Sequence, residues 1–542
     1  MFERMVRSPL FYIFLFALII RTYHLGTIPN GFHVDEVKVG WNAYSILKTG
    51  ADDWGKSWQL YYNSFGDFRP SGIIYLDIPF IALFGLHEWV VRLPAALFGA
   101  LLTIPIYYFT LLTTKKRNTA LLAAFFSTIS PWGIDLSRAT SEAIIAVFLV
   151  MSGLCFLIKY IQSPKMRFLF FAFCFLFSSY FFYHSARLLV PILVVGIVYF
   201  YRGNVFYRNS IEVIKKPLLI ITCILFISTF FFATIGESKE RFSQVSIFND
   251  LNIKTMRDQL PFEDGANNVF TARLFHNKYA LYSIELIQQY TKYFSPDFLI
   301  GDAGNPLRYT TVGNGVLLFV ELFLFVLGIG TVLKSKFNRL PFYLLLLAPL
   351  PAALTTEDVP NMSRAAFMIP FISILVAYGF VSLTKLRWKF IISILLLINS
   401  IYFFHMYFVH NKSHEPIPLN RNVGTRQVIE EIMKVKDQYD IIYLTNIPDS
   451  LYPWFAFYTK PDPKEFNNVA KTREDGVWQY GNVIFGQIKC PTKDVNDKDY
   501  PGKKILFVDA EGCDLNPETV KHNKLVEIKR TQGGTAYTLW TN

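Results

Sequence analysis

Charge is scarce in the apolar stretches of this chain. Of the 542 residues, 52% are hydrophobic and 17% are aromatic, whereas only 17% are charged. The apolar residues fall in blocks of about 15 to 25, the length that a helix needs to cross a bilayer. Short basic or polar loops separate these blocks. The composition therefore excludes an ordinary soluble enzyme and predicts a mainly α, polytopic membrane protein.

Nucleotide-phosphate signatures are also lacking. The sequence has no P-loop, no glycine-rich dinucleotide turn after a strand and no large cytoplasmic domain, which disfavours a cytoplasmic reaction with ATP or a nucleotide sugar. The formal charge of +12 suggests nucleic acid at first sight. However, the excess Lys and Arg lie in short loops between apolar blocks, as the positive-inside rule explains. We expect no nucleic-acid partner.

Cysteine is rare, with five in the chain. Cys155, Cys174 and Cys223 lie in apolar blocks and are expected to be core residues. Cys490 and Cys513 lie in the polar tail, where a disulfide can form if that tail is extracytoplasmic. The sequence leaves this pairing open.

The apolar blocks predict about 11 to 13 transmembrane helices, and Met1 to Leu25 is interpreted as a retained first helix. The predicted spans cover residues 9–25, 90–112, 119–134, 140–161, 168–183, 187–201, 217–235, 315–333, 341–355, 365–383 and 390–409. The short segment 71–86 is left uncrossed, because every short cytoplasmic loop is then basic.

Two domains follow from this topology. Residues 1–410 form a transmembrane domain, with a first external loop at 26–89 and a large external loop at 236–313. The large loop is expected to contain amphipathic helices lying at the interface. Residues 411–542 change to a charged composition with strand-like runs, which predicts a small soluble α/β domain on the extracytoplasmic side.

Asp35 and Glu36 are adjacent carboxylates just past the first span. A carboxylate at the membrane surface can take a proton from an incoming hydroxyl or hold a metal. His33 and Asp35 offer two metal ligands, but no second His or Cys follows at a useful spacing. The sequence therefore requires no cofactor and leaves a divalent metal open.

Four arginines lie at the predicted outer ends of spans: Arg69, Arg138, Arg187 and Arg364. A guanidinium there can hold a phosphate through two hydrogen bonds and stabilise a lipid phosphate as it leaves. The alternative is interfacial snorkelling. Asp135 offers a second acidic position. An enzyme that faces outward needs an activated substrate within the lipid, and a polyprenyl-phosphate-linked sugar meets that requirement.

Short motifs occur in a fixed order over roughly residues 10–390. They include Pro29-Asn30-Gly31-Phe32 before Asp35-Glu36, Arg69-Pro70, Arg92-Leu93-Pro94, Ser130-Pro131-Trp132 before Arg138, Ala186-Arg187, and Pro351-Ala352-Ala353 before Arg364. In this order they resemble the C-superfamily glycosyltransferases (GT-C). The nearest relatives are the dolichyl-phosphate-mannose protein mannosyltransferases and the aminoarabinose transferases of lipid A.

The resemblance implies an integral plasma-membrane glycosyltransferase of the cell envelope. It would transfer a sugar from a polyprenyl-phosphate donor to a lipid, glycan or protein acceptor on the extracytoplasmic face. The resemblance gives Asp35 the role of general base in an inverting reaction, with Glu36 as its helper. It gives Arg69 the role of binding the donor phosphate. The chain has Pro70-Ser71 where aminoarabinose transferases usually have Pro-Pro, and it lacks the β-trefoil insertions of the mannosyltransferases. The donor sugar and the acceptor therefore stay open.

Two other functions remain as alternatives. A flippase or transporter of lipid-linked sugars needs ionisable groups near mid-membrane, and the spans hold few. A scaffold that presents the tail would tolerate charge removal in the first external loop. The tail itself either binds an acceptor or caps the active site. Its aromatic residues Trp454, Phe455 and Tyr458 could stack on sugars, but their spacing favours a helix packed on a core.

Overall fold

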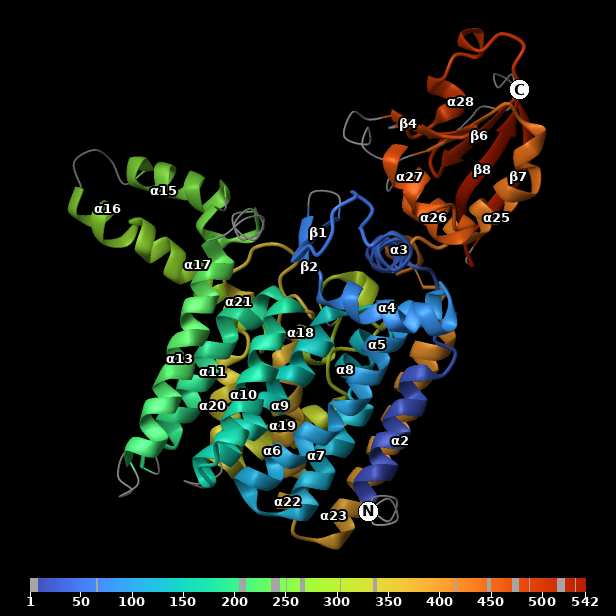
Figure 1. Ribbon diagram of the computed structural model, residues 1–542. Coiled ribbons are helices and arrows are strands. Elements are labelled where there is room, and N and C mark those ends of the chain that lie inside the picture. The colour runs from blue at the N-terminus through green and yellow to red at the C-terminus, as the bar shows by residue number, and fades with distance from the viewer. Residues whose placement is uncertain are drawn as a thin grey trace. The chain divides into compact units, whose positions relative to one another are not determined.

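The structure is a computed structural model of the chain, shown in Figure 1. It describes residues 8–64, 67–203, 211–234, 244–249, 251–263, 269–302, 304–334, 339–414, 417–445, 450–469, 477–486, 488–513, 522–531 and 533–542. Two compact units divide the chain. The first comprises Met1–Tyr23, Leu60–Gly72 and Ala95–Met406, and the second comprises His24–Gln59, Ile73–Pro94 and Tyr407–Asn542.

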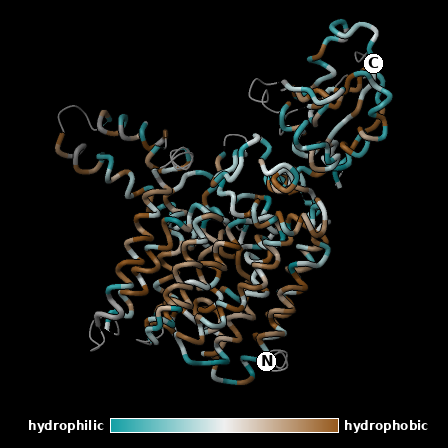
Figure 2. Tube along the Cα trace, in the orientation of Figure 1, coloured by the Kyte–Doolittle hydropathy of each residue, from teal (hydrophilic) through white to brown (hydrophobic). Residues whose placement is uncertain are grey.

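The first unit is a helical bundle. Its longer helices are α2 (Pro9–Thr22), α6 (Thr103–Thr114), α7 (Arg117–Ile129), α9 (Glu142–Gln162), α10 (Met166–Ser178), α11 (His184–Phe200), α13 (Ile211–Thr234), α19 (Phe319–Lys334), α20 (Leu340–Leu347), α22 (Ile369–Ser382) and α23 (Leu386–His405). Figure 2 shows these helices in the hydrophobic colour along most of their length. Because apolar residues occur all round several helices, the pattern is that of membrane spans and not of one-sided amphipathic helices.

Each predicted span coincides with one helix or two consecutive helices. By length and composition, Glu88–Thr114, Glu142–Gln162 and Leu386–His410 can each cross a membrane. A fourth span is possible if Arg117–Ile129 and Pro131–Ser137, which meet at 55°, count as one. The described residues include seven shorter apolar helices of 10–17 residues. Three or four crossings are thus supported, and the rest of the predicted 11 to 13 stay predictions.

Helices α19 and α22 pack closely because glycines face each other across them. A Cβ at Gly328 of α19 would collide with the carbonyl oxygen of Leu375. Likewise, a Cβ at Gly379 of α22 would collide with the carbonyl oxygen of Leu324. Small residues let helix backbones approach in this way inside membranes.

Polar loops and short elements cap one end of the bundle. They are the hairpin β1 (Tyr61–Ser64) and β2 (Asp67–Pro70), with α8 (Pro131–Ser137), η1 (Ser179–Phe181), α18 (Pro296–Ile300), η3 (Leu307–Tyr309), α21 (Leu350–Ala353) and η4 (Ala366–Met368). The predicted loop 236–313 also contains η2 (Ile247–Asn249), α15 (Leu251–Glu263), α16 (Val269–Phe275) and α17 (Lys278–Lys292). Other parts of this loop lie outside the described residues. Large apolar side chains such as Phe262 and Phe270 are exposed on these helices, as expected of an interfacial segment.

The second unit is built on a six-stranded mixed sheet. The strand order is β4-β5-β3-β6-β8-β7, and the central strand β3 runs parallel to both of its neighbours. The strands are β3 (Ile441–Leu444), β4 (Val477–Tyr480), β5 (Val483–Gly486), β6 (Ile505–Ala510), β7 (Asn523–Lys529) and β8 (Thr535–Thr541). Helices of the tail are α24 (Ile417–Asn420), α25 (Thr425–Val435), α26 (Tyr452–Thr459), α27 (Pro463–Val469) and α28 (Pro491–Asp494), with the short turns η6 (Lys436–Gln438) and η8 (Asp497–Asp499). The predicted C-terminal α/β fold is therefore present.

This second unit also includes segments that precede the tail by more than 300 residues in sequence. They are α3 (Val34–Thr49), α4 (Gly72–Phe84) from Ile73 onward, and the start of α5 (Glu88–Leu101). The π-helix η5 (Met406–His410), which directly precedes the tail, belongs to it from Tyr407 onward. The indole N–H of Trp454 donates to the carbonyl of Phe32 at 2.8 Å, and the Lys38 ammonium bonds both Asp53 and Tyr452 at 2.6 Å. These buried bonds hold α3 against α26.

The five cysteines comprise one disulfide pair and three free thiols. Cys490 and Cys513 form a disulfide within the second unit. Cys155 and Cys174 are half-buried free thiols, whereas Cys223 on α13 is exposed at the surface of the bundle. The expectation that Cys223 is a core residue was wrong, because its apolar surroundings in the sequence form the outer face of α13.

Candidate functional site

The first unit contains a cavity of about 590 Å³. Four arginines from well-separated parts of the chain line it: Arg69, Arg187, Arg308 and Arg364. Four carboxylate residues line it as well: Asp67, Glu142, Glu357 and Asp358. Its volume is in the range of small-molecule sites. Asp67 pairs with Arg69 and Glu357 pairs with Arg364, so carboxylates hold these two arginines in place.

Arg69 enters the cavity from the β1–β2 hairpin. Its Nε donates to Asp67 Oδ2 at 2.9 Å, and its Nη1 lies 4.0 Å from Glu142 Oε1. The antiparallel pairing of β1 with β2 places Tyr62 opposite Arg69 and fixes the backbone of this residue. The hairpin thus presents a positioned guanidinium at the start of α9, where Glu142 lies.

Arg187, in the first turn of α11, is fixed on several sides. Its Nε and Nη2 donate to the carbonyl of Tyr180 at 3.0 and 2.9 Å. The rings of Tyr61 and Phe232 lie 5.0 and 4.8 Å from its guanidinium carbon, within cation–π distance. This guanidinium has little freedom to turn away from the cavity.

His184 positions Arg187 through a defined tautomer. Its Nε2 lies 3.1 Å from the carbonyl oxygen of Phe68, and its Nδ1 lies 3.0 Å from Arg187 Nη1. A carbonyl only accepts and a guanidinium only donates. The imidazole is therefore neutral with its proton on Nε2, and it links the β1–β2 hairpin to α11.

Arg364 closes another side of the cavity. Its Nη2 donates to Glu357 Oε2 at 2.6 Å, and its Nη1 donates to Thr355 Oγ1 at 2.9 Å and to the Glu357 carbonyl at 2.5 Å. A guanidinium has five N–H donors. Two of the five therefore make no hydrogen bond to the described residues and are available to an oxyanion.

Three of the four arginines predicted for the donor phosphate, Arg69, Arg187 and Arg364, are brought together here, whereas Arg138 is not among the lining residues. Both Nη atoms of Arg138 donate to the last carbonyls of α2, Ile20 at 2.5 Å and Tyr23 at 2.6 Å. These bonds satisfy acceptors that a helix end leaves open. Its predicted phosphate role gains no support from the cavity.

Sequence reasoning missed Arg308, which lies in η3 within the large external loop. Asn305-Pro306 just before it, in a segment otherwise rich in aromatic residues, is the signal that could have indicated an ordered loop. Asp135, the proposed second acidic position, is buried in α8 and accepts a hydrogen bond from Thr311 Oγ1 at 2.7 Å. It does not line the cavity.

The acidic pair lies in the second unit, in the first turn of α3. His33 is the N-cap, and its Nδ1 accepts a hydrogen bond from the Asp35 N–H at 3.1 Å. Glu36 is clamped by two arginines. Its carboxylate bonds Arg92 Nε at 2.9 Å and Arg421 Nη2 at 2.8 Å. The two neighbours therefore differ: Glu36 belongs to a buried ion-pair network, and Asp35 is held by the capping histidine.

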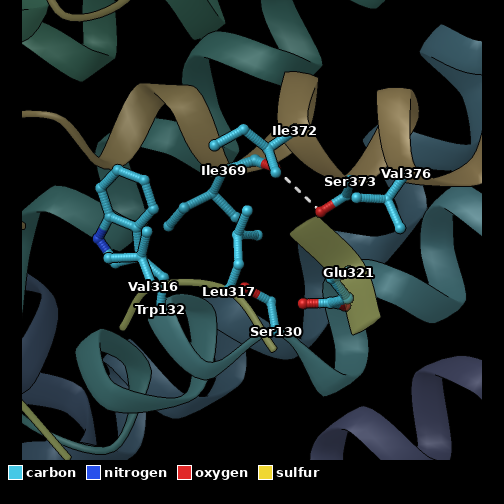
Figure 3. A pocket seen from close by; sticks show the side chains of 9 residues that line it. All are labelled: Ser130, Trp132, Val316, Leu317, Glu321, Ile369, Ile372, Ser373 and Val376. Atoms are coloured by element: carbon cyan, nitrogen blue, oxygen red, sulfur yellow. Dashed lines mark hydrogen bonds between the residues drawn. The ribbon is translucent and has the colours of Figure 1, made fainter. Parts of the chain in front are cut away.

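A much smaller cavity of about 10 Å³ lies deeper in the bundle, beside α19 and α22. Figure 3 shows its lining, which includes Ser130, Glu321 and Ser373. Glu321 accepts a hydrogen bond from the Leu318 N–H at 3.1 Å and so caps the start of α19. The space suffices for about one water molecule and excludes a sugar.

The next question is whether the described side chains could hold a metal ion. Among the described residues, no three His, Cys, Asp or Glu side chains gather closely enough to hold a metal ion. His33 uses its Nδ1 to cap α3, and its ring lies 3.4 Å from the Asp35 carboxylate. A divalent metal on this pair stays a prediction.

Comparison with known proteins places this geometry in context. Residues 69–232 match the family described as Dolichyl-phosphate-mannose-protein mannosyltransferase. A search of curated proteins gave no sequence match. Among solved structures, the chain is similar to ArnT from Cupriavidus metallidurans bound to undecaprenyl phosphate, with a TM-score of 0.56, 11% identity and 98% coverage of both chains. Apo ArnT gives a TM-score of 0.51 at 12% identity, covering 98% of this chain and 96% of that one.

The family match and the shared fold confirm the resemblance to the GT-C superfamily. The three helices that are long and apolar enough to cross a membrane support a membrane location. The matched segment, residues 69–232, contains Arg69 and Arg187 of the cavity and ends within α13.

Proposed function

We propose that this chain, which has the GT-C fold, is a membrane glycosyltransferase. It transfers a sugar from a polyprenyl-phosphate donor to a hydroxyl of a lipid, glycan or protein acceptor on the extracytoplasmic face of the plasma membrane. The observation that carries this proposal is the convergence of Arg69, Arg187, Arg308 and Arg364 on one cavity. Guanidinium groups bind phosphate oxygens through two parallel hydrogen bonds.

The donor class receives support from two sides. The ArnT structure with the same fold is bound to undecaprenyl phosphate. In addition, the matching family is named for a dolichyl-phosphate-linked sugar. A long polyprenyl chain can stay in the lipid while its phosphate reaches the arginines at the polar end of the bundle. Both hexosyl and pentosyl donors are compatible with a cavity of about 590 Å³.

The chemistry follows from the charge that develops on the leaving group. The acceptor oxygen forms a bond to the anomeric carbon, and the bond from that carbon to the phosphate oxygen breaks. The electron pair leaves with the polyprenyl phosphate, whose new negative charge the arginines stabilise. The hydroxyl proton goes to a carboxylate, and Asp35 is the proposed acceptor of that proton. Attack opposite the leaving group inverts the anomeric configuration.

Two features support an extracytoplasmic reaction. The disulfide between Cys490 and Cys513 suits an oxidising compartment. The short loops predicted to face the cytoplasm are basic, as with Lys115, Lys116 and Arg117 between α6 and α7.

Radiolabelled polyprenyl-phosphate sugars test the proposal. The purified chain in nanodiscs is incubated with each donor and with membranes that supply acceptors, and labelled products are separated. We expect one donor to yield a labelled acceptor and free polyprenyl phosphate. Asp35→Asn should abolish transfer while the protein still inserts normally.

Two outcomes would count against this function. Full activity of Asp35→Asn would remove the assigned base. Flipping of lipid-linked sugars in proteoliposomes, with no transfer from any donor, would favour the transporter instead.

A further inference from the structure

The second unit contains a cavity of its own, of about 130 Å³. It is roughly ten times larger than a single water molecule requires. Its walls come from the turn before α3, from Glu88 at the start of α5, from the first turn of α25 and from α26. None of its lining residues lines the arginine cavity of the first unit.

Three aromatic residues belong to the lining of this cavity: Phe32, Trp454 and Tyr458. Trp454 is buried, as is its neighbour Phe455, which agrees with the expectation that these aromatic residues of the tail pack in a core. Phe32 is buried as well, whereas Tyr458 is only half-buried. The aromatic surface that a ligand in the cavity can reach is therefore that of Tyr458.

Polar side chains also belong to the lining. They include the amides of Asn422 and Gln427 and the hydroxyl of Thr27. Amides and hydroxyls can both donate and accept hydrogen bonds. A ligand with several hydroxyl groups can therefore form hydrogen bonds with these side chains.

Charge within the cavity is balanced. Glu88 Oε1 accepts a hydrogen bond from the Tyr458 hydroxyl at 2.6 Å and lies 3.9 Å from Arg426 Nη1. The Glu88 side chain is only 14% exposed, so an anion placed beside it would meet a poorly screened carboxylate. The site therefore disfavours a phosphate or carboxylate ligand and suits an uncharged one.

We propose that this cavity binds one uncharged sugar ring of a glycan. The C–H face of the ring packs against the accessible part of the Tyr458 ring, because that face is apolar. The ring hydroxyls bond Gln427, Asn422 and the carboxylate of Glu88. A concave, partly aromatic site with a few convergent polar groups is the usual architecture for such ligands.

Saturation-transfer NMR on the full chain in nanodiscs tests this assignment. The probes are the methyl glycosides of mannose, galactose and N-acetylglucosamine, which carry no phosphate. We expect at least one of them to bind saturably. Gln427→Leu keeps the size of the side chain and removes one hydrogen-bonding partner, so binding should weaken about three- to tenfold. The matched control is Gln438→Leu, because Gln438 is exposed in the same unit and does not line the cavity.

A second variant tests glycoside binding at another residue of the cavity. Glu88→Gln retains an acceptor for the Tyr458 hydroxyl but removes the charge, and it should also weaken binding of the glycoside. The assignment is overturned if no probe binds saturably, or if Gln427→Leu and Glu88→Gln both bind as tightly as Gln438→Leu. Because no labelled donor is involved, this result is independent of the transfer assay.

Discussion

At the scale of single residues, Asp35 and Glu36 have different surroundings although they are adjacent. The Glu36 carboxylate is buried between Arg92 and Arg421. Removing one partner of a buried ion pair costs about 3–5 kcal/mol, because the remaining charges lose their compensation. We therefore predict that Glu36→Gln lowers the unfolding temperature of the purified protein strongly.

Asp35→Asn is the matched comparison for that variant. The backbone N–H of Asp35 bonds His33, so this contact survives the substitution. The unfolding temperature of Asp35→Asn should stay close to that of the wild type while sugar transfer is lost. Thermal unfolding followed by circular dichroism measures both variants. Equal stability of Glu36→Gln and wild type would contradict the structural role of Glu36.

Asp52 provides a prediction about pH. Its Oδ1 accepts hydrogen bonds from the N–H groups of Trp54 at 2.9 Å and Lys56 at 2.8 Å. Burial raises the pKa of the Asp52 carboxyl above its usual value. Because the folded pKa is raised, ionisation opposes folding. This cost is absent below the unfolded pKa, grows as the pH rises through the folded pKa, and persists at neutral pH.

Asp52→Asn should therefore raise the unfolding temperature at pH 7, since the amide oxygen keeps both hydrogen bonds without the charge. The gain should disappear near pH 4. Asp52→Ala loses both bonds and should cost about 1–2 kcal/mol at either pH. An unfolding temperature for Asp52→Asn below that of the wild type at pH 7 would refute this reading.

The sequence alone predicted part of the arginine cavity. Arginines at the outer ends of spans indicated Arg69, Arg187 and Arg364, which the cavity brings together. The sequence could not separate these from Arg138, because its bonds to the end of α2 depend on a contact more than 100 residues away. The same limit applies to Arg308, whose place depends on the path of a long loop.

At the scale of elements, the close packing of α19 against α22 depends on glycine. Gly328→Ala would force a methyl group against the backbone of α22, since a Cβ there meets the carbonyl of Leu375. Overpacking of this kind costs about 1–3 kcal/mol. We predict a lower unfolding temperature for Gly328→Ala in detergent micelles.

The control lies two residues away on the same helix. A Cβ at Gly330 meets no atom within 4 Å, so Gly330→Ala should leave the unfolding temperature unchanged or raise it slightly. If both variants behaved alike, close packing of α19 on α22 would not explain the glycine at position 328.

Hydropathy predicted the helices well, because an apolar block long enough to span a bilayer must satisfy its backbone internally as a helix. Each predicted span coincides with one helix or a consecutive pair. Breaks inside spans were not predicted. Ser130-Pro131 bends the chain between α7 and α8, and the bend of 55° reflects a proline that opens a new helix.

At the scale of the whole molecule, the boundary at residue 411 captured the sheet but missed the early segments of the second unit. Residues 24–59 and 73–94 belong to it through tertiary contacts, such as the Trp454 bond to Phe32, that composition does not reveal. A change in composition marks where a domain begins along the chain. It cannot show which distant segments pack against that domain.

Topology is testable with single introduced cysteines. Lys464→Cys lies on α27 of the tail, and Lys116→Cys lies in the basic loop between α6 and α7. Both positions are exposed. A membrane-impermeant maleimide added to intact cells should label Lys464→Cys and leave Lys116→Cys and the wild type unlabelled. The reverse pattern would place the tail in the cytoplasm and contradict an extracytoplasmic reaction.

The central claim is that the arginine cavity holds the donor phosphate during sugar transfer. The most direct measurement is kcat/KM for a radiolabelled polyprenyl-phosphate sugar, compared between the wild type, Arg364→Gln and Arg339→Gln. Arg364 lines the cavity, whereas Arg339, which precedes α20, does not line it and donates a hydrogen bond to the Leu333 carbonyl. Losing a charged hydrogen bond costs about 1.5–3 kcal/mol, so Arg364→Gln should lower kcat/KM about 10- to 150-fold. Arg339→Gln should stay within about twofold of the wild type, because Arg339 does not line the cavity. Equal kcat/KM values for Arg364→Gln and Arg339→Gln would contradict the account.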